Sequence, residues 1–117
     1  MAGTVVLPFA ATEDAAARGA SGDVVWHSGV QRGFMRISGL RRNDATREQY
    51  QLWVFDGTRD DRYPVDGGVF DIDESGDAII PIRVPIPVRT ATLFAVTVEK
   101  PGGVVVSSRE RIVLAAK

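Results

Sequence analysis

The residues with the most suggestive chemistry lie between Asp71 and Asp77, in the sequence Asp-Ile-Asp-Glu-Ser-Gly-Asp. Their side-chain oxygens fall at the first, third and fifth places of a calcium-binding loop, with glycine at the sixth. The twelfth place, where such a loop needs a bidentate carboxylate, is Ile82, and no helix is expected on either side. A solvated acidic turn explains the same residues, and we favour this interpretation over a calcium site.

His27, the only histidine, lies next to Ser28, which suggests a general base beside a nucleophile. Adjacent residues of a strand point to opposite faces, so these two side chains cannot meet directly. The chain has no Gly-x-Ser-x-Gly motif to present a serine, and it has no cysteine. No pair of carboxylates lies on a predictable common face, as glycoside hydrolysis would require. We therefore expect no enzymatic activity, no metal and no cofactor.

The charged residues argue against a nucleic-acid partner. Fourteen basic and fifteen acidic side chains give a formal net charge of −1, without a run of one sign. A nucleic-acid binder needs a basic stripe that displaces counterions. The cluster of Arg41, Arg42 and Arg47 is offset by Asp44 and Glu48, and no aromatic platform is interleaved with it.

Other candidate binding features have structural explanations. The segment Arg59–Arg62 alternates in sign, which favours a solvated loop over a partner-binding loop. The glycine pairs within 66–68 and 101–103 open no helix, so we interpret them as turns rather than phosphate cradles. Trp53 and Trp26 could stack on a sugar if they were exposed, but their apolar strand positions favour the core.

The spacing of apolar runs predicts the fold that must position these residues. Short apolar runs alternate with Gly, Pro, Asp and Ser clusters about every ten residues. This pattern predicts an all-β fold: an antiparallel β-sandwich, Ig-like or Greek-key, of about eight strands, forming one domain over residues 1–117. The expected strands are Thr4–Phe9, Asp23–His27, Gly33–Ser38, Gln49–Phe55, Val69–Ile72, Ala78–Val84, Ala91–Glu99, Val104–Ser107 and Arg111–Ala115, with a short helix over Thr12–Arg18.

Particular residues predict where some strands lie in the sheets. Pro8 and Pro81 cannot donate to a ladder, so their strands belong at edges or bulges. Gln49–Phe55 carries apolar side chains on both faces, which indicates a central strand. Lys100–Gly103 is typical of a type II turn, since Pro presets φ at its second position and Gly tolerates a positive φ at its third.

Three segments resemble a known family. They are the strand Tyr50-Gln51-Leu52-Trp53-Val54, the step Gly67–Phe70 and the hairpin Phe94–Gly103, followed by the apolar strand Ile112–Leu114. Together they resemble the C-terminal domain of the anti-sigma-K factor RskA family, over roughly residues 33–115. The resemblance implies a structural role for the motif residues Tyr50, Gln51, Leu52, Trp53, Gly68, Phe70, Thr97, Glu99, Pro101, Gly102 and Gly103.

The chain departs from the family pattern in two places. Ser107–Glu110 stands where many members have Pro-Thr-Gly-Pro before the last strand. The stretch Asp56–Asp66 is longer and more charged than the usual short turn. The first departure leaves the expected fold intact, and the second puts any shared ligand in doubt.

The resemblance implies a non-enzymatic regulatory domain on the extracytoplasmic side of a single-pass bacterial membrane protein. In this family a cytoplasmic segment holds a sigma factor inactive, and regulated proteolysis releases the sigma factor. The sigma-binding and membrane-spanning segments would lie outside this chain, which has no run of about 18 apolar residues. A membrane-associated protease or another protein would be a partner of these residues. The alternative is a glycan- or protein-binding sandwich of a secreted or surface protein, with Trp26 and Tyr63 as its aromatic contacts.

Overall fold

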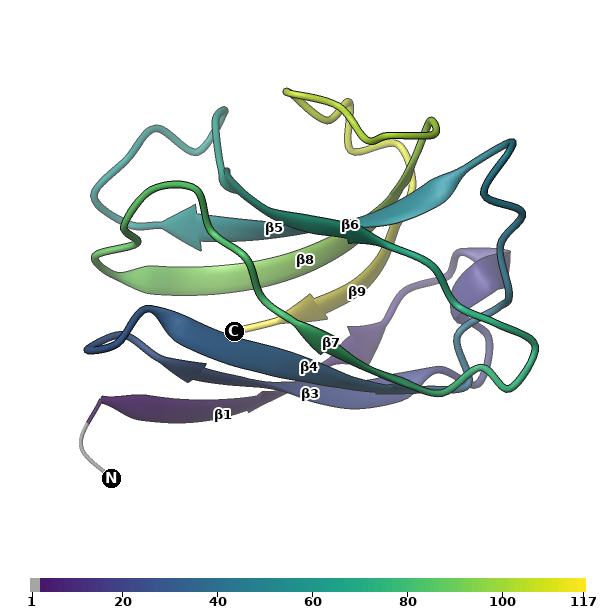
Figure 1. Ribbon diagram of the computed structural model, residues 1–117, viewed down its shortest axis with the longest axis horizontal. Helices are drawn as coiled ribbons and strands as arrows, with labels where there is room; N and C mark the ends of the chain where they lie inside the picture. The colour runs from purple at the N-terminus through teal and green to yellow at the C-terminus, as the bar shows by residue number, and fades with distance from the viewer. Residues whose placement is uncertain (1–2) are drawn as a thin grey trace.

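The computed structural model describes residues 3–117, which form two antiparallel sheets packed face to face (Figure 1). One sheet has four strands in the order β1-β3-β4-β7, and the other has five in the order β2-β9-β8-β5-β6. The prediction of an all-β antiparallel sandwich is confirmed. The elements are β1 (Thr4–Pro8), β2 (Ala10–Ala11), the 3-10 turn η1 (Ala15–Ala17), β3 (Ser21–His27), β4 (Arg32–Ser38), β5 (Gln49–Asp56), β6 (Val65–Phe70), β7 (Ala78–Pro81), β8 (Ala91–Glu99) and β9 (Ile112–Ala116).

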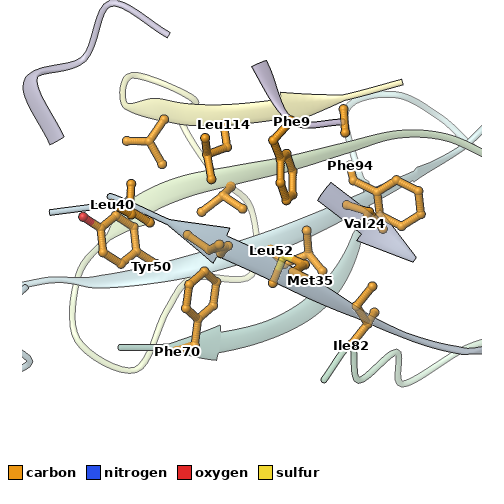
Figure 2. Packing of buried hydrophobic residues seen from close by; sticks show 14 of the residues in the cluster. Phe9, Val24, Met35, Leu40, Tyr50, Leu52, Phe70, Ile82, Phe94 and Leu114 are labelled. Atoms are coloured by element: carbon orange, nitrogen blue, oxygen red, sulfur yellow. The ribbon is translucent and has the colours of Figure 1, made fainter. Parts of the chain in front are cut away.

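The core lies between the two sheets and follows from the alternation of side chains along each strand. Leu52 of β5 and Phe94 of β8 point inward from the five-stranded sheet, and Met35 of β4 points inward from the other sheet (Figure 2). Trp26 of β3 packs against Phe94, with ring centroids 6.2 Å apart. Each such buried side chain contributes roughly 1.5–3 kcal/mol of hydrophobic free energy.

The chain crosses from one sheet to the other on both sides of the sandwich. On one side, Phe9 links β1 to β2, and its N–H donates to the carbonyl of Gly22 at 2.9 Å. On the other side, the segment after β7 bridges the sheets: Ile82 N–H donates to the carbonyl of Gly33 and Arg83 N–H to that of Gly67, both at 3.0 Å. These two crossings cover the sides of the core that the two sheets leave open.

Several positional predictions are confirmed. Pro8 and Pro81 lie in β1 and β7, the two edge strands of the four-stranded sheet. The strand β5 pairs with β8 on one side and β6 on the other. At the predicted turn, Gly102 has φ +86°, and Gly103 N–H donates to the carbonyl of Lys100 at 2.9 Å.

The predicted helix over Thr12–Arg18 is wrong, because only the single turn η1 forms. Thr12 does not cap it. Instead Thr12 continues the pairing of β2 with β9, donating its N–H to Val113 and its hydroxyl to Ile112. Asp14 is the N-cap and accepts from Ala16 N–H at 2.9 Å.

Three strand predictions need correction. Val104–Ser107 forms no strand, because Val104 pairs with a side chain rather than with a neighbouring strand. The strand predicted over Val69–Ile72 is β6, which begins four residues earlier and ends at Phe70. Its pairing with β5 continues past Gly67 with a one-residue shift between Leu52 and Trp53, so Val65 and Asp66 also belong to the strand. The strand predicted to reach Val84 ends at Pro81, where the bridging segment begins.

No helical element within residues 3–117 has the length and apolar character needed to cross a membrane.

Candidate functional site

The most elaborate polar arrangement lies on the outer face of the five-stranded sheet, away from the core. Gln51, Trp53 and Phe55 alternate with the core residues of β5 and therefore point to this face. Gln51 and Trp53 are nevertheless only 1% exposed. Residues 100–111 connect β8 to β9, and we call this segment the strap. It bonds to Gln51 through Val104 and to Glu99 through Ser107, and we infer that it covers the Trp53 ring. In Figure 1 the strap is the yellow-green to yellow segment that rises above β5 and β8.

A chain of hydrogen bonds attaches the strap to the sheet. Trp53 Nε1 donates to Thr97 Oγ1 at 2.9 Å, and Thr97 Oγ1 donates to Glu99 Oε2 at 2.6 Å. The hydroxyl of Ser107, on the strap, donates to the same carboxylate oxygen. Ser107 Oγ in turn accepts from Arg109 N–H at 2.9 Å. A buried indole and a carboxylate of the sheet thereby hold the middle of the strap.

The side-chain amide of Gln51 holds the strap at a second point, because it makes the pair of hydrogen bonds that the backbone of a neighbouring strand would make. Its Nε2 donates to the carbonyl of Val104 at 3.1 Å, and its Oε1 accepts from Val104 N–H at 3.0 Å. Gly103 has φ +78°, and a Cβ there would lie 2.8 Å from Gln51 Oε1 and 2.6 Å from Val69 Cγ2. Glycine is therefore required at Gly103 both for its backbone conformation and for the close approach of the strap.

Arg109 holds the far end of the strap against the neighbouring loop, residues 57–64. Its backbone has φ +60°, a conformation that side-chain-bearing residues rarely adopt. Its guanidinium carbon lies 4.9 Å from the centroid of the Phe55 ring, and Nη2 donates to the carbonyl of Asp61. A hollow of about 440 Å³ lies beside it, with an apolar floor from β8 and β9 that includes Leu93 and Ala115.

Asp56 fixes the start of the 57–64 loop. Its buried carboxylate accepts hydrogen bonds from the N–H groups of Thr58, Arg89 and Thr90 and from the hydroxyl of Thr58. Burial alone would raise the pKa of this carboxyl, but the hydrogen bonds outweigh it and lower the pKa to about 2. Sequence reasoning missed this role, although an aspartate before Gly and Thr is a typical sign of such a turn.

Arg111, at the end of the strap, joins β9 to η1. Two nitrogens of its guanidinium donate to the two oxygens of Asp14 at 3.0 Å each, and Nη1 lies 3.3 Å from Glu48 Oε1. The hydrogen bond from Arg111 lowers the pKa of Asp14, against the opposing effect of burial. No local pattern indicates this pairing, because Asp14 and Arg111 are 97 residues apart.

The motif residues named from the sequence divide between the two faces of the sheet. Tyr50, Leu52 and Phe70 point into the core, where the rings of Tyr50 and Phe70 stack with centroids 5.7 Å apart. Burial raises the pKa of Tyr50 to about 12, and its hydroxyl donates to the carbonyl of Arg41 at 2.6 Å. The motif residues associated with the outer face or the strap are Gln51, Trp53, Thr97, Glu99, Pro101, Gly102 and Gly103, and Gly68 lies at the bulge of β6.

The carboxylates of the acidic turn, residues 71–77, do not converge on one point. Asp71 Oδ1 accepts from the side-chain amides of Asn43 and Gln49, whereas Asp73 Oδ1 accepts from the N–H and hydroxyl of Ser75. Across residues 3–117, no group of three or more His, Cys, Asp or Glu side chains is placed to hold a metal ion. His27 accepts from the N–H of Val30 through Nδ1 at 3.3 Å.

The two aromatic residues of the binding-module alternative lie in different environments. Trp26 is buried in the core, so it offers no surface for stacking on a sugar. Tyr63 is exposed, and Arg62 lies over its ring at 5.6 Å. Arg62 also pairs with Asp60 at 2.7 Å on the surface.

The comparison with protein families settles what this scaffold is. A family model described as the C-terminal region of anti-sigma-K factor RskA matches residues 3–108, nearly the whole chain and most of the strap. The chain belongs to this RskA family. Searches of curated proteins and of solved structures gave no match. The predicted resemblance is confirmed. RskA proteins are anti-sigma factors, so this domain has a regulatory role in a protein whose partner is a sigma factor.

Proposed function

We propose that residues 1–117 are the extracytoplasmic regulatory domain of a membrane-anchored RskA protein. The membership of residues 3–108 in the RskA C-terminal family is the observation that carries this proposal. The segment that binds the sigma factor and the segment that spans the membrane lie outside this chain. The domain itself neither inserts into the membrane nor binds nucleic acid.

The domain acts through its shape and stability rather than through chemistry. The carboxylates of Asp14, Asp56 and Glu99 accept hydrogen bonds from the chain's own donors. This supports a structural role for the ionisable groups around the strap. The folded domain would therefore control how readily a membrane-associated protease, or another protein, reaches the anchored molecule.

The strap is the part of the domain best placed to respond to a signal. Apart from Arg111 at its end, whose carbonyl accepts from Val98 N–H of β8, the strap is held by side chains, through Gln51, Glu99 and Arg109. Its release would uncover Trp53 and Gln51, both almost fully buried in the closed state. A signal that displaces the strap would thus weaken the domain and expose the anchored protein to cleavage.

Cysteine labelling tests the location of the domain. The chain has no cysteine, and Val105, in the strap, is 91% exposed. In the full-length protein in intact cells, the Val105→Cys variant should react with a membrane-impermeant maleimide. The parent protein and a Val113→Cys variant, altered at a buried core position, are the controls and should remain unlabelled at these sites. Labelling of Val105→Cys only after cell lysis would place the domain in the cytoplasm and contradict the proposal.

A further inference from the structure

The strand β1 forms an open edge of the four-stranded sheet. It pairs with β3 on one side, and within residues 3–117 no strand pairs with its other side (Figure 1). The five-stranded sheet is better protected, because Arg83 of the bridging segment donates to Gly67 of β6 at one edge and β2 has only two residues at the other. β1 therefore offers a longer free edge than β2 or β6.

The hydrogen bonds around β1 reveal which of its backbone groups face outward. Phe9 N–H and the carbonyl of Gly3 both bond to the β3 side, to Gly22 and Ser28. Because alternate residues of an antiparallel strand face the same neighbour, Val5 and Leu7 also face β3. The backbone groups of Thr4, Val6 and Pro8 consequently face the open edge.

Apart from Pro8 at its end, this edge lacks the features that usually prevent strands from pairing. Natural edge strands are commonly blocked by charged residues, bulges or proline. Thr4–Leu7 carries no charge, its pairing with β3 has no bulge, and Val6 is 56% exposed. Pro8 at its end lacks an N–H but still has an accepting carbonyl.

We propose that β1 pairs antiparallel with β1 of a second copy of this chain, about a twofold axis at Val6. In this register the two Val6 residues exchange N–H to carbonyl hydrogen bonds. Each Thr4 N–H donates to the carbonyl of Pro8 in the other copy. Because Pro8 has no N–H to return, only the Thr4 carbonyl of each copy is left without a donor at this edge. The two four-stranded sheets thereby become one sheet of eight strands.

The observations favour a second copy because the edge is complementary to itself. Two uncharged strands meet without like-charge repulsion, and the register pairs all five residues of each β1. On the outer face, Val6 lies opposite Val25 and Val25 opposite Phe34, so pairing joins two apolar rows side by side. Because only five residues of each copy meet, we expect the contact to bury less than the roughly 1,200 Å² of a stable interface and the dimer to be weak in solution.

Single-cysteine variants of the 117-residue chain test both the dimer and its register. The Val6→Cys variant brings two thiols together across the axis, where paired residues have Cα atoms about 5.5 Å apart, within reach of a disulfide. In a Thr4→Cys variant the same atoms are offset by four residues, roughly 13 Å, beyond that reach. Under mild oxidation at about 1 mM chain, we expect a disulfide-linked dimer from Val6→Cys and a monomer from Thr4→Cys. Equal cross-linking of both variants, or of neither, would overturn the proposal.

Charged variants distinguish this pairing from contact through β7, the other edge of the same sheet. In sedimentation equilibrium, Val6→Lys should raise the dissociation constant roughly tenfold or more, because like charges then face each other. Ile79→Lys, an exposed position in β7, should leave it unchanged. A mixture of the Val6→Lys and Val6→Glu variants should recover association. Loss of association in Ile79→Lys, or no loss in Val6→Lys, would rule out pairing through β1.

Discussion

At the residue scale, Trp53 shows how burial and position can differ. The side chain is almost fully buried, yet it lies outside the core between the sheets, under the strap and bonded to Thr97. Its stabilising effect therefore depends on the strap staying in place. Packing of the residues between the two sheets would not by itself provide this stabilisation.

Replacing Trp53 separates the contribution of its ring from that of its N–H. Trp53→Ala should lower the free energy of unfolding by roughly 3–5 kcal/mol, as expected for loss of a large buried ring. Trp53→Phe keeps an apolar ring and loses the hydrogen bond to Thr97, so it should cost less, nearer 1 kcal/mol. Denaturant unfolding measures both. An unchanged midpoint in Trp53→Ala would show that the strap does not cover this ring.

The hydrogen-bonded carboxylate of Asp56 should make the folded protein less stable in acid. Its folded-state pKa of about 2 lies below the ordinary value of 3.8, so the charged form is favoured in the folded protein. The resulting stabilisation, about 2 kcal/mol, is fully present above pH 4 and is lost as the pH falls toward 2. The difference in unfolding free energy between the parent and Asp56→Asn should shrink over this range. A difference that stays constant as the pH falls to about 2 would contradict this role of the Asp56 carboxylate.

At the element scale, the strap depends on two glycines with different constraints. Both have a positive φ, but a Cβ at Gly102 would meet nothing within 4 Å, whereas one at Gly103 would meet Gln51 and Val69. Gly102→Ala should therefore cost only the conformational penalty, roughly 1–2 kcal/mol. Gly103→Ala should cost more and should speed hydrogen exchange at Val104 N–H. Equal costs would contradict the close approach of the strap to the sheet.

Some strands and turns of the fold could be predicted from the sequence, and others could not. Strands with clear alternation and the turn at Lys100–Gly103 were predicted from local patterns, because side-chain period and turn chemistry are local properties. Val104–Ser107 was wrongly predicted as a strand, since an apolar run does not reveal that its backbone pairs with the Gln51 side chain.

Long-range contacts account for the remaining errors. The helix over Thr12–Arg18 failed because Thr12 bonds to Ile112, 100 residues away. The candidate site was partly foreseen, since Gln51, Trp53, Thr97 and Glu99 were singled out as motif residues. Their hydrogen-bond chain to Ser107 and the anchoring by Asp56 depend on tertiary contacts that no local pattern contains.

At the scale of the whole molecule, the two sheets present different outer faces. The five-stranded sheet is covered by the strap and bordered by the 57–64 loop. The four-stranded sheet leaves Val6, Phe34 and Ile79 exposed and keeps an open edge at β1. The five-stranded sheet is therefore the side on which release of the strap would control the domain's stability. The four-stranded sheet is the side on which two copies of the chain would meet.

The most direct test of the account measures sigma-dependent transcription and cleavage of the full-length protein in cells carrying Trp53→Ala, Gly103→Ala or Gly102→Ala. If the folded domain protects the anchored protein, cleavage and transcription should rise in the order of lost stability, with Gly102→Ala closest to the parent. Destabilised variants that remain uncleaved at the membrane and keep transcription at the parent's level would contradict it.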